Sequence, residues 1–158
     1  MATSTYAIAI GSNRRGRHGA PASEVRAAIA ALDGVRAVAP IIGSAPLGPS
    51  LRRYANTALL LDSDLSPPQL LARLKAIERL FGRRRGRRWG SRVIDLDVVL
   101  WSGGCWSGPG LTVPHVAFRA RDFVLRPLAR IAAGWRDPVT GRTVRQLHQL
   151  VDRARPRD

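Results

Sequence analysis

Residues 66–101 read SPPQLLARLKAIERLFGRRRGRRWGSRVIDLDVVLW, and this stretch carries the strongest structural signals in the chain. Ser66 followed by two prolines is a typical helix start, and apolar side chains then recur on one face as far as Phe81. Gly82 ends the predicted helix. Residues 83–92 follow as a glycine-punctuated loop of arginines, and residues 93–101 have the composition of a strand. The stretch therefore predicts a helix, a basic loop and a strand in that order.

The flanking sequence extends this pattern in both directions. An apolar run at residues 6–10 predicts a strand that enters a turn at Gly11-Ser12-Asn13. Ser23 can cap a helix that Gly34 closes, and strand-like runs follow at residues 35–42 and 54–61. The order β-α-β-β-α-β is that of an α+β, ferredoxin-like βαββαβ sandwich, with helices on one face of a mainly antiparallel sheet.

Two further helices are expected in the C-terminal part of the chain. They span residues 123–132 and 144–153 and are joined by a turn at residues 137–141. The chain has 158 residues, 45% of them hydrophobic and 23% charged, which favours one compact domain over residues 1–158 and disfavours intrinsic disorder. We therefore expect the C-terminal helices to add to that one domain.

Composition also excludes several classes of protein. The apolar runs fall well short of the roughly 20 residues that a membrane-spanning helix needs. The first residues lack a basic segment followed by an apolar one, so the expected location is the cytoplasm and no membrane partner is expected. Cys105 is the only cysteine and can form neither an internal disulfide nor a thiolate zinc site.

The charge is strongly unbalanced, with 26 basic and 11 acidic residues and a net charge of +15. Arginine-rich codon usage would explain the preference for arginine over lysine, but it does not explain clustering. Seven arginines lie within the fourteen residues 79–92: Arg79, Arg83, Arg84, Arg85, Arg87, Arg88 and Arg92. Such density indicates a site for a polyanion, either the phosphates of a nucleotide or a nucleic-acid backbone.

Asp95 and Asp97 are the sharpest chemical signal. Residues i and i+2 of a strand share a face, with Cα atoms about 6.5–7 Å apart, so both carboxylates can reach one or two Mg²⁺ ions. Leu96 and Val98 would then face the core. An alternative is that the two aspartates form ion pairs with the nearby arginines.

The other candidate residues are interpreted together with this pair of aspartates. Phosphoryl transfer needs charge neutralisation, and guanidinium groups match phosphate oxygens, so Arg83, Arg85, Arg88 and Arg92 are expected to bind phosphate, with Arg79 at the surface. Other candidates each keep a structural alternative: Trp89 stacks on a ring or caps the core, His115 after Pro114 contacts phosphate or is structural, and Glu78 is a surface or ion-paired residue. Tyr54, Asn56 and Phe123 could hold a planar heterocycle, although core packing would explain both aromatic rings equally well.

Taken in order, these motifs resemble a known family. They are YAIAIGSN at residues 6–13, PLGP at 46–49, YAN at 54–56, Glu78, GRRR at 82–85, RWGSR at 88–92, DLD at 95–97 and LTVPH at 111–115, continuing to Arg121. Together they resemble the 6-hydroxymethyl-7,8-dihydropterin pyrophosphokinases of folate biosynthesis, over roughly residues 6–150. The resemblance implies a ferredoxin-like fold and transfer of diphosphate from ATP to the pterin hydroxymethyl group, with release of AMP.

The resemblance also implies a role for each matching residue. Asp95 and Asp97 would hold two Mg²⁺ ions, and Arg83 and Arg92 would be catalytic arginines. ATP would contact Glu78, Arg85, Arg88, Trp89, Leu111, Thr112, His115 and Arg121. The pterin would lie among Ser44, Leu47, Tyr54, Asn56, Trp89 and Phe123. Separately from these roles, we expect ATP and a hydroxymethyl-dihydropterin to be the partners, with no nucleic acid, and we expect the protein to be a monomer.

Several positions depart from the family pattern. The segment at residues 50–53 and the arginine loop are each about one residue shorter than usual. Lys75 and Gly110 replace a polar residue and an arginine, and residues 14–19 resemble an insertion. These departures bear on nucleotide affinity rather than on the two aspartates.

Two other functions compete with this interpretation. A net charge of +15 and aromatic residues near the arginine run would suit an RNA- or DNA-binding module. That function leaves Asp95 and Asp97 unexplained, because carboxylates repel phosphate unless a metal is present. A metal-dependent nuclease is the remaining alternative, and it is excluded if oligonucleotides survive incubation with Mg²⁺ and the protein.

Overall fold

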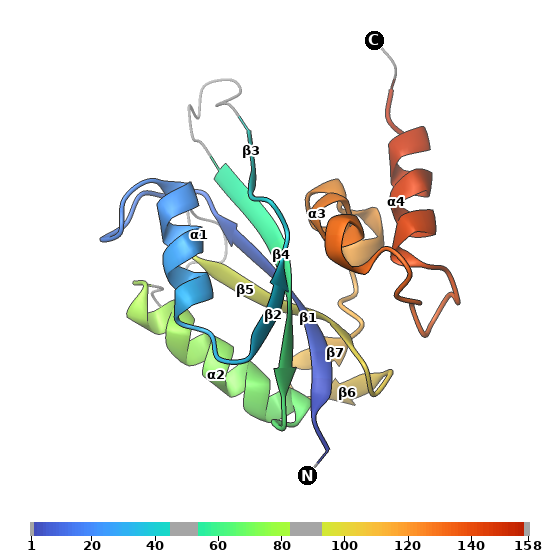
Figure 1. The fold of residues 1–158 in the computed structure, drawn as a ribbon, viewed down its shortest axis with the longest axis horizontal. Coiled ribbons are helices and arrows are strands. Elements are labelled where there is room, and N and C mark those ends of the chain that lie inside the picture. The colour runs from blue at the N-terminus through green and yellow to red at the C-terminus, as the bar shows by residue number, and fades with distance from the viewer. Residues whose placement is uncertain (1, 45–53, 83–92, 157–158) are drawn as a thin grey trace.

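An antiparallel sheet forms the centre of the computed structural model, which describes residues 2–44, 54–82 and 93–156 (Figure 1). Its strands are β1 (Ser4–Ser12), β2 (Val35–Val38), β3 (Ile42–Ser44), β4 (Tyr54–Ser63) and β5 (Asp95–Trp101). Their order is β2-β4-β1-β5, and β3 also pairs with β4. Every pairing is antiparallel, which confirms the α+β class and the mainly antiparallel sheet.

Helices α1 (Pro21–Ala30) and α2 (Pro67–Leu80) cover one face of this sheet. Inward side chains of β1 and β5, such as Ile8 and Leu96, pack there against Leu74 and the other buried residues of both helices. Ser66 begins α2 with a capping box, because its hydroxyl accepts from the Gln69 amide and the Gln69 side chain accepts from the Ser66 amide. The start of α2 is therefore as predicted.

Helix α3 (Asp122–Ala132) packs on the opposite face of the sheet, and helix α4 (Val144–Arg153) packs against α3. Ala9, Ala58 and Val99 meet the buried side chains of α3 there. A hairpin of β6 (Trp106–Gly108) and β7 (Leu111–Val113) follows β5, and the short helix η2 (Phe118–Ala120) precedes α3. Both C-terminal helices agree closely with the predicted ranges.

Three local predictions were wrong. Ser23 does not cap α1: the N-cap is Ala20, three residues earlier, because Pro21 at the first position of the helix already has the helical backbone angle. The run at residues 35–42 divides into β2 and β3 around Pro40, which has no amide hydrogen for the ladder. Gly11 and Ser12 do not form a turn but continue β1, since both pair with β4.

No helix among the described residues is both long and apolar enough to cross a membrane.

Candidate functional site

The site begins with two rows of residues that run across the sheet. Gly11 of β1 is paired with Asn56 of β4 on one side and with Asp95 of β5 on the other. In the next row with the same orientation, Ala9 lies between Ala58 and Asp97. Residues directly opposite each other in a sheet share a face, so Asn56 and both aspartates point to the side of α3 and α4.

Gly11 is the central residue of the first row, and the Asn56 side chain lies close to its backbone. A Cβ atom at this position would lie 2.8 Å from the Oδ1 atom of Asn56. The Asn56 amide therefore leans over the glycine backbone, toward the strand that carries Asp95. Glycine leaves room for this approach without moving the Asn56 side chain, so Gly11 belongs to the strand beside Asn56 rather than to a turn.

Asp95 and Asp97 are partly exposed, whereas Leu96 and Val98 are 1% and 3% exposed and belong to the opposite core. This alternation confirms that the two carboxylates share one face of β5. Among the described residues, no group of three or more His, Cys, Asp or Glu side chains could hold a metal by itself. A cation bound by the two aspartates would therefore take further oxygen ligands from a phosphate or from water.

His115 follows β7 and is hydrogen-bonded to β5, since its amide donates to the Val99 carbonyl of that strand at 3.0 Å. The ring Nδ1 accepts from the Ala117 amide at 3.1 Å, so a neutral ring carries its proton on Nε2. Burial lowers the pKa of His115, the positive charge of Arg121 lowers it further, and Asp95 acts in the opposite direction. His115, Arg121 and Asp95 therefore form one electrostatic cluster, with His115 as a neutral donor at physiological pH.

Arg121 is the N-cap residue immediately before α3, and its side chain lies over the ring of Phe123, with its Cζ atom 5.6 Å from the ring centroid. Phe123 is 42% exposed, and Tyr54 at the start of β4 is 41% exposed. Such exposure does not fit core packing, the alternative that the sequence left open for these two rings. Tyr54 has the same strand orientation as Asn56, so both belong to the face that α3 covers in part.

Glu78 of α2 is fully buried, so it is not a surface residue. Its Oε2 atom accepts from the Leu96 amide at 2.9 Å, between the two aspartates, and its Oε1 atom is 3.3 Å from the Nζ atom of Lys75. Lys75, a departure from the family pattern, thus forms an ion pair with the buried carboxylate. The spacing of three residues on a helix is the signal that would have predicted this pair.

The other predicted positions fall in four groups. Leu111 and Thr112 lie on β7, which leads through Pro114 to His115, with Leu111 packed against the α1–α2 core and Thr112 exposed. Ser44 ends β3, where its backbone pairs with Tyr54. Arg79 is exposed, as predicted. Leu47, Arg83, Arg85, Arg88, Trp89 and Arg92 lie outside the described residues.

A separate cavity of about 430 Å³ lies at the opposite end of the sheet. Asp33, Asp62 and Asp64 line it, and Asp62 pairs with Thr5 near the start of β1, far along the strand from Gly11. These three carboxylates outnumber the arginine that also lines the cavity, which makes it unsuited to a phosphate group. Asn56, Asp95 and Asp97 lie instead in the rows of Gly11 and Ala9.

Known proteins resemble this chain over most of its length. A sequence model of the family described as 7,8-dihydro-6-hydroxymethylpterin-pyrophosphokinase matches residues 7–133. The chain is 44% identical over 109 residues to a 2-amino-4-hydroxy-6-hydroxymethyldihydropteridine pyrophosphokinase of Synechocystis, covering 69% of this chain and 56% of that protein. Proteins of the same name from Pseudomonas aeruginosa and Haemophilus influenzae are 40% and 36% identical over 137 and 135 residues, covering 83% and 82% of this chain and 82% of each relative.

Proposed function

The chain belongs to the 7,8-dihydro-6-hydroxymethylpterin-pyrophosphokinase family, and we propose from this premise that the sheet face bearing Asp95 and Asp97 is where its reaction takes place. The enzyme is a pyrophosphokinase of folate biosynthesis that transfers diphosphate from ATP to hydroxymethyldihydropterin. The pterin hydroxyl oxygen bonds to the β-phosphorus and loses its proton to solvent. The bond from the β-phosphorus to the oxygen that joins it to the α-phosphorus breaks, and AMP leaves with that oxygen. Such a reaction depends mainly on positioning and on neutralising phosphate charge.

One observation carries the location of the site. The row Asn56–Gly11–Asp95 places an amide suited to a heterocycle and a carboxylate suited to a metal on the same sheet face. His115 and Arg121 join that face from the segment before α3, close enough to influence each other and Asp95. The same end of the sheet thus offers groups for both substrates.

An ATP-dependent kinase requires Mg²⁺ in general, and the residues of this face suit it. Asp95 and Asp97 are hard oxygen donors that are partly exposed and lie on one face of β5. Strand β5 is an edge strand of the sheet. We propose that they hold two Mg²⁺ ions, which when bound neutralise phosphate charge and orient the reacting groups. Glu78, through the Leu96 amide between the two aspartates, fixes the strand that presents them.

ATP is proposed to bind across the basic groups of the site. His115 would donate its Nε2 proton to a phosphate oxygen, because Nδ1 already accepts from the Ala117 amide. Arg121 would add a fixed positive charge. We assign the catalytic role to Arg83 and Arg92, and ATP contacts to Glu78, Arg85, Arg88, Trp89, Leu111 and Thr112, on their positions in the family motifs.

The pterin is proposed to occupy the part of the face nearer β4. The Asn56 amide has both a donor and an acceptor, as the amide-like edge of a pterin requires. The exposed rings of Tyr54 and Phe123 can stack on a planar heterocycle. Ser44, Leu47 and Trp89 complete the proposed pterin site.

The decisive experiment uses purified protein, ATP, Mg²⁺ and 6-hydroxymethyl-7,8-dihydropterin. Separation of the nucleotides should show AMP in equal amount to a pterin product whose mass has increased by a diphosphate. Formation of ADP, or nucleotide turnover that does not depend on the pterin, would contradict the proposal. A control without Mg²⁺ should give no product.

We further propose that the protein acts as a cytoplasmic monomer of one domain, residues 1–158, with no nucleic-acid partner. The absence of a nucleic-acid partner is supported by Asp95 and Asp97, because two carboxylates repel the phosphates of a nucleic-acid backbone unless a metal ion lies between them. Oligonucleotides that bound tightly at physiological salt and inhibited turnover would contradict this. Light scattering of the purified protein would measure the oligomeric state.

A further inference from the structure

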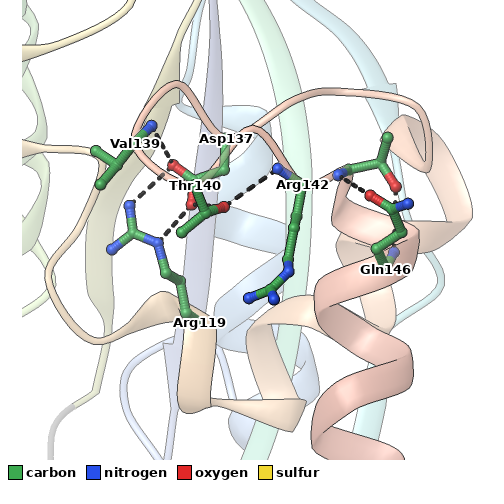
Figure 2. Close-up of polar contacts among 7 residues, drawn as sticks. Arg119, Asp137, Val139, Thr140, Arg142 and Gln146 are labelled. Atoms are coloured by element: carbon green, nitrogen blue, oxygen red, sulfur yellow. Dashed lines mark hydrogen bonds and ion pairs between the residues drawn. The ribbon is translucent and has the colours of Figure 1, made fainter.

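Arg119 lies on η2, between His115 and Arg121, but its guanidinium group is engaged elsewhere. Its Nε atom is 2.5 Å from Oδ2 of Asp137 and its Nη2 atom is 2.9 Å from Oδ1, so two parallel hydrogen bonds join the side chains (Figure 2). Asp137 belongs to the turn between α3 and α4. The positive charge of Arg119 is therefore neutralised within the protein.

Asp137 is fully buried and organises the turn around itself (Figure 2). Its carboxylate also accepts from the Val139 amide at 3.0 Å and from the Thr140 hydroxyl at 2.7 Å. The Asp137 backbone closes the same turn through hydrogen bonds with Gly141 and Arg142, each 2.8 Å long. Arg119 thus binds to a turn whose conformation is itself fixed by several hydrogen bonds.

The segment at residues 115–121 has two other attachments. The His115 amide donates to Val99 of β5, and the Phe118 side chain is 1% exposed within the α3–α4 core. The guanidinium of Arg119 also covers the Phe118 ring, with its Cζ atom 4.9 Å from the ring centroid. The Arg119–Asp137 pair is the attachment that joins the C-terminal part of this segment, next to Arg121, to the turn between α3 and α4.

We propose that the Arg119–Asp137 pair is a positioning element for the pyrophosphokinase reaction, which holds the segment carrying His115 and Arg121 in the geometry that binds the ATP phosphates. The proposal rests on the proposed function, since the ATP contacts of His115 and Arg121 are part of it. Arg119 itself contacts no substrate. It acts by tying the phosphate-binding segment to the turn between α3 and α4.

Physical reasons favour a positioning role over a purely stabilising one. A buried ion pair gains little stability over well-packed apolar side chains, because removing both charges from water is costly. Two parallel hydrogen bonds between planar groups do, however, fix both distance and orientation. A displacement of about 1 Å at a phosphate-binding group is enough to weaken binding strongly.

The test compares single and double variants of the pair. Arg119→Met and Asp137→Asn should each raise the KM for ATP by roughly 3- to 30-fold, the range typical of residues that act through a network. The KM for the pterin and kcat should remain close to those of the unaltered enzyme. If Arg119 instead contacted phosphate directly, Asp137→Asn would release its charge and lower the KM for ATP, which would overturn the proposal.

The double variant Arg119→Met/Asp137→Asn separates positioning from stability, because an amide oxygen at position 137 can still accept hydrogen bonds from Val139 and Thr140. It should recover unfolding free energy relative to the single variants, because no buried charge is left unpaired. Its KM for ATP should nevertheless stay high, since the two orienting hydrogen bonds are gone. Recovery of ATP binding together with stability would overturn the proposal.

Two controls distinguish this inference from the proposed function. Val25→Ala truncates a fully buried side chain of α1 on the opposite face and should lower stability without changing the KM for ATP. His115→Ala reports on the ATP site itself: an unchanged KM there would contradict the proposed function. A raised KM in His115→Ala but not in Arg119→Met would overturn the positioning role alone.

Hydrogen exchange gives a readout that needs no activity. The amides of Ala117, Ala120 and Arg121 are hydrogen-bonded within the segment. Arg119→Met should accelerate their exchange, whereas Val25→Ala should leave their rates relative to the α3 amides unchanged. Equal exchange in Arg119→Met and the unaltered protein would overturn the proposal.

Discussion

Asp97 lies between two buried neighbours on β5 and presents its carboxylate to the partly exposed site face. Removing it should therefore affect chemistry far more than folding. We expect Asp97→Ala to lower kcat by at least about 10²-fold, since a metal ligand supplies several kcal/mol of transition-state stabilisation. The melting temperature should change little. Steady-state kinetics and thermal unfolding measure the two effects.

The matched control for Asp97 is Asp33→Ala. The Asp33 side chain is 91% exposed at the far end of the sheet, where it pairs with Arg73. Losing an exposed ion pair costs little, so both kcat and stability should be retained. An Asp97→Ala enzyme as active as the Asp33→Ala enzyme would refute the assignment of Asp97 to the metal site.

Gly11 is the second residue whose role can be isolated. In Gly11→Ala the new methyl group would meet Oδ1 of Asn56, which can move because it is the end of a side chain. The fold should survive, but the displaced amide should raise the KM for the pterin by roughly 10-fold, the cost of about one misplaced hydrogen bond. Gly134→Ala is the control, since a Cβ atom there would meet none of the described residues within 4 Å beyond its chain neighbours. Equal pterin affinity in both variants would contradict the close approach.

At the scale of elements, Glu78 joins α2 to β5. Glu78→Ala would leave the Leu96 amide without its acceptor and would remove the carboxylate that pairs with Lys75, so it should lower the unfolding free energy by about 1–3 kcal/mol. Glu78→Gln should recover most of this loss, because the amide oxygen can still accept. Urea unfolding measures both. Equal losses in the two variants would show that charge, not the Leu96 hydrogen bond, matters at this position.

Elements were predictable where their signals are local. The capping box of α2 lies within four residues, and the apolar stripe that follows is periodic, so α2 was predicted correctly. The split between β2 and β3 was missed because the run around Pro40 retains strand composition. Whether β1 ended before or after Gly11 depended on its partners, since β4 and β5 supply the hydrogen bonds that continue it.

At the scale of the whole molecule, the site depends on contacts between distant parts of the sequence. The residue types of Asp95, Asp97 and His115 indicated phosphate chemistry, and their spacing showed that the aspartates share a face. The row that joins Asn56, Gly11 and Asp95 could not be predicted from the sequence, because sheet register here pairs Gly11 with residues 45 and 84 positions further along the chain. The Arg119–Asp137 pair was missed because it joins η2 to a turn beyond α3, and no local pattern relates these two residues.

That pair also sets how acid acts on the stability of the molecule. Burial opposes ionisation of Asp137, but hydrogen bonds from Arg119, Thr140 and Val139 outweigh it and lower its pKa from 3.8 to about 2. A carboxyl whose pKa is depressed by folding stabilises the protein above its unfolded pKa and loses this contribution as pH falls. The contribution should be about 2 kcal/mol above pH 5, with about half of it lost by pH 3.

Denaturant unfolding of the unaltered protein and of Asp137→Asn between pH 3 and pH 7 tests this prediction. The variant has no proton to lose at position 137, so the difference in unfolding free energy should be largest and constant above pH 5. It should narrow below pH 4, because the carboxyl of the unaltered protein binds a proton more readily when unfolded than when folded. A difference that stayed constant down to pH 3 would mean that Asp137 titrates alike in both states, and that its hydrogen bonds do not favour the charged form.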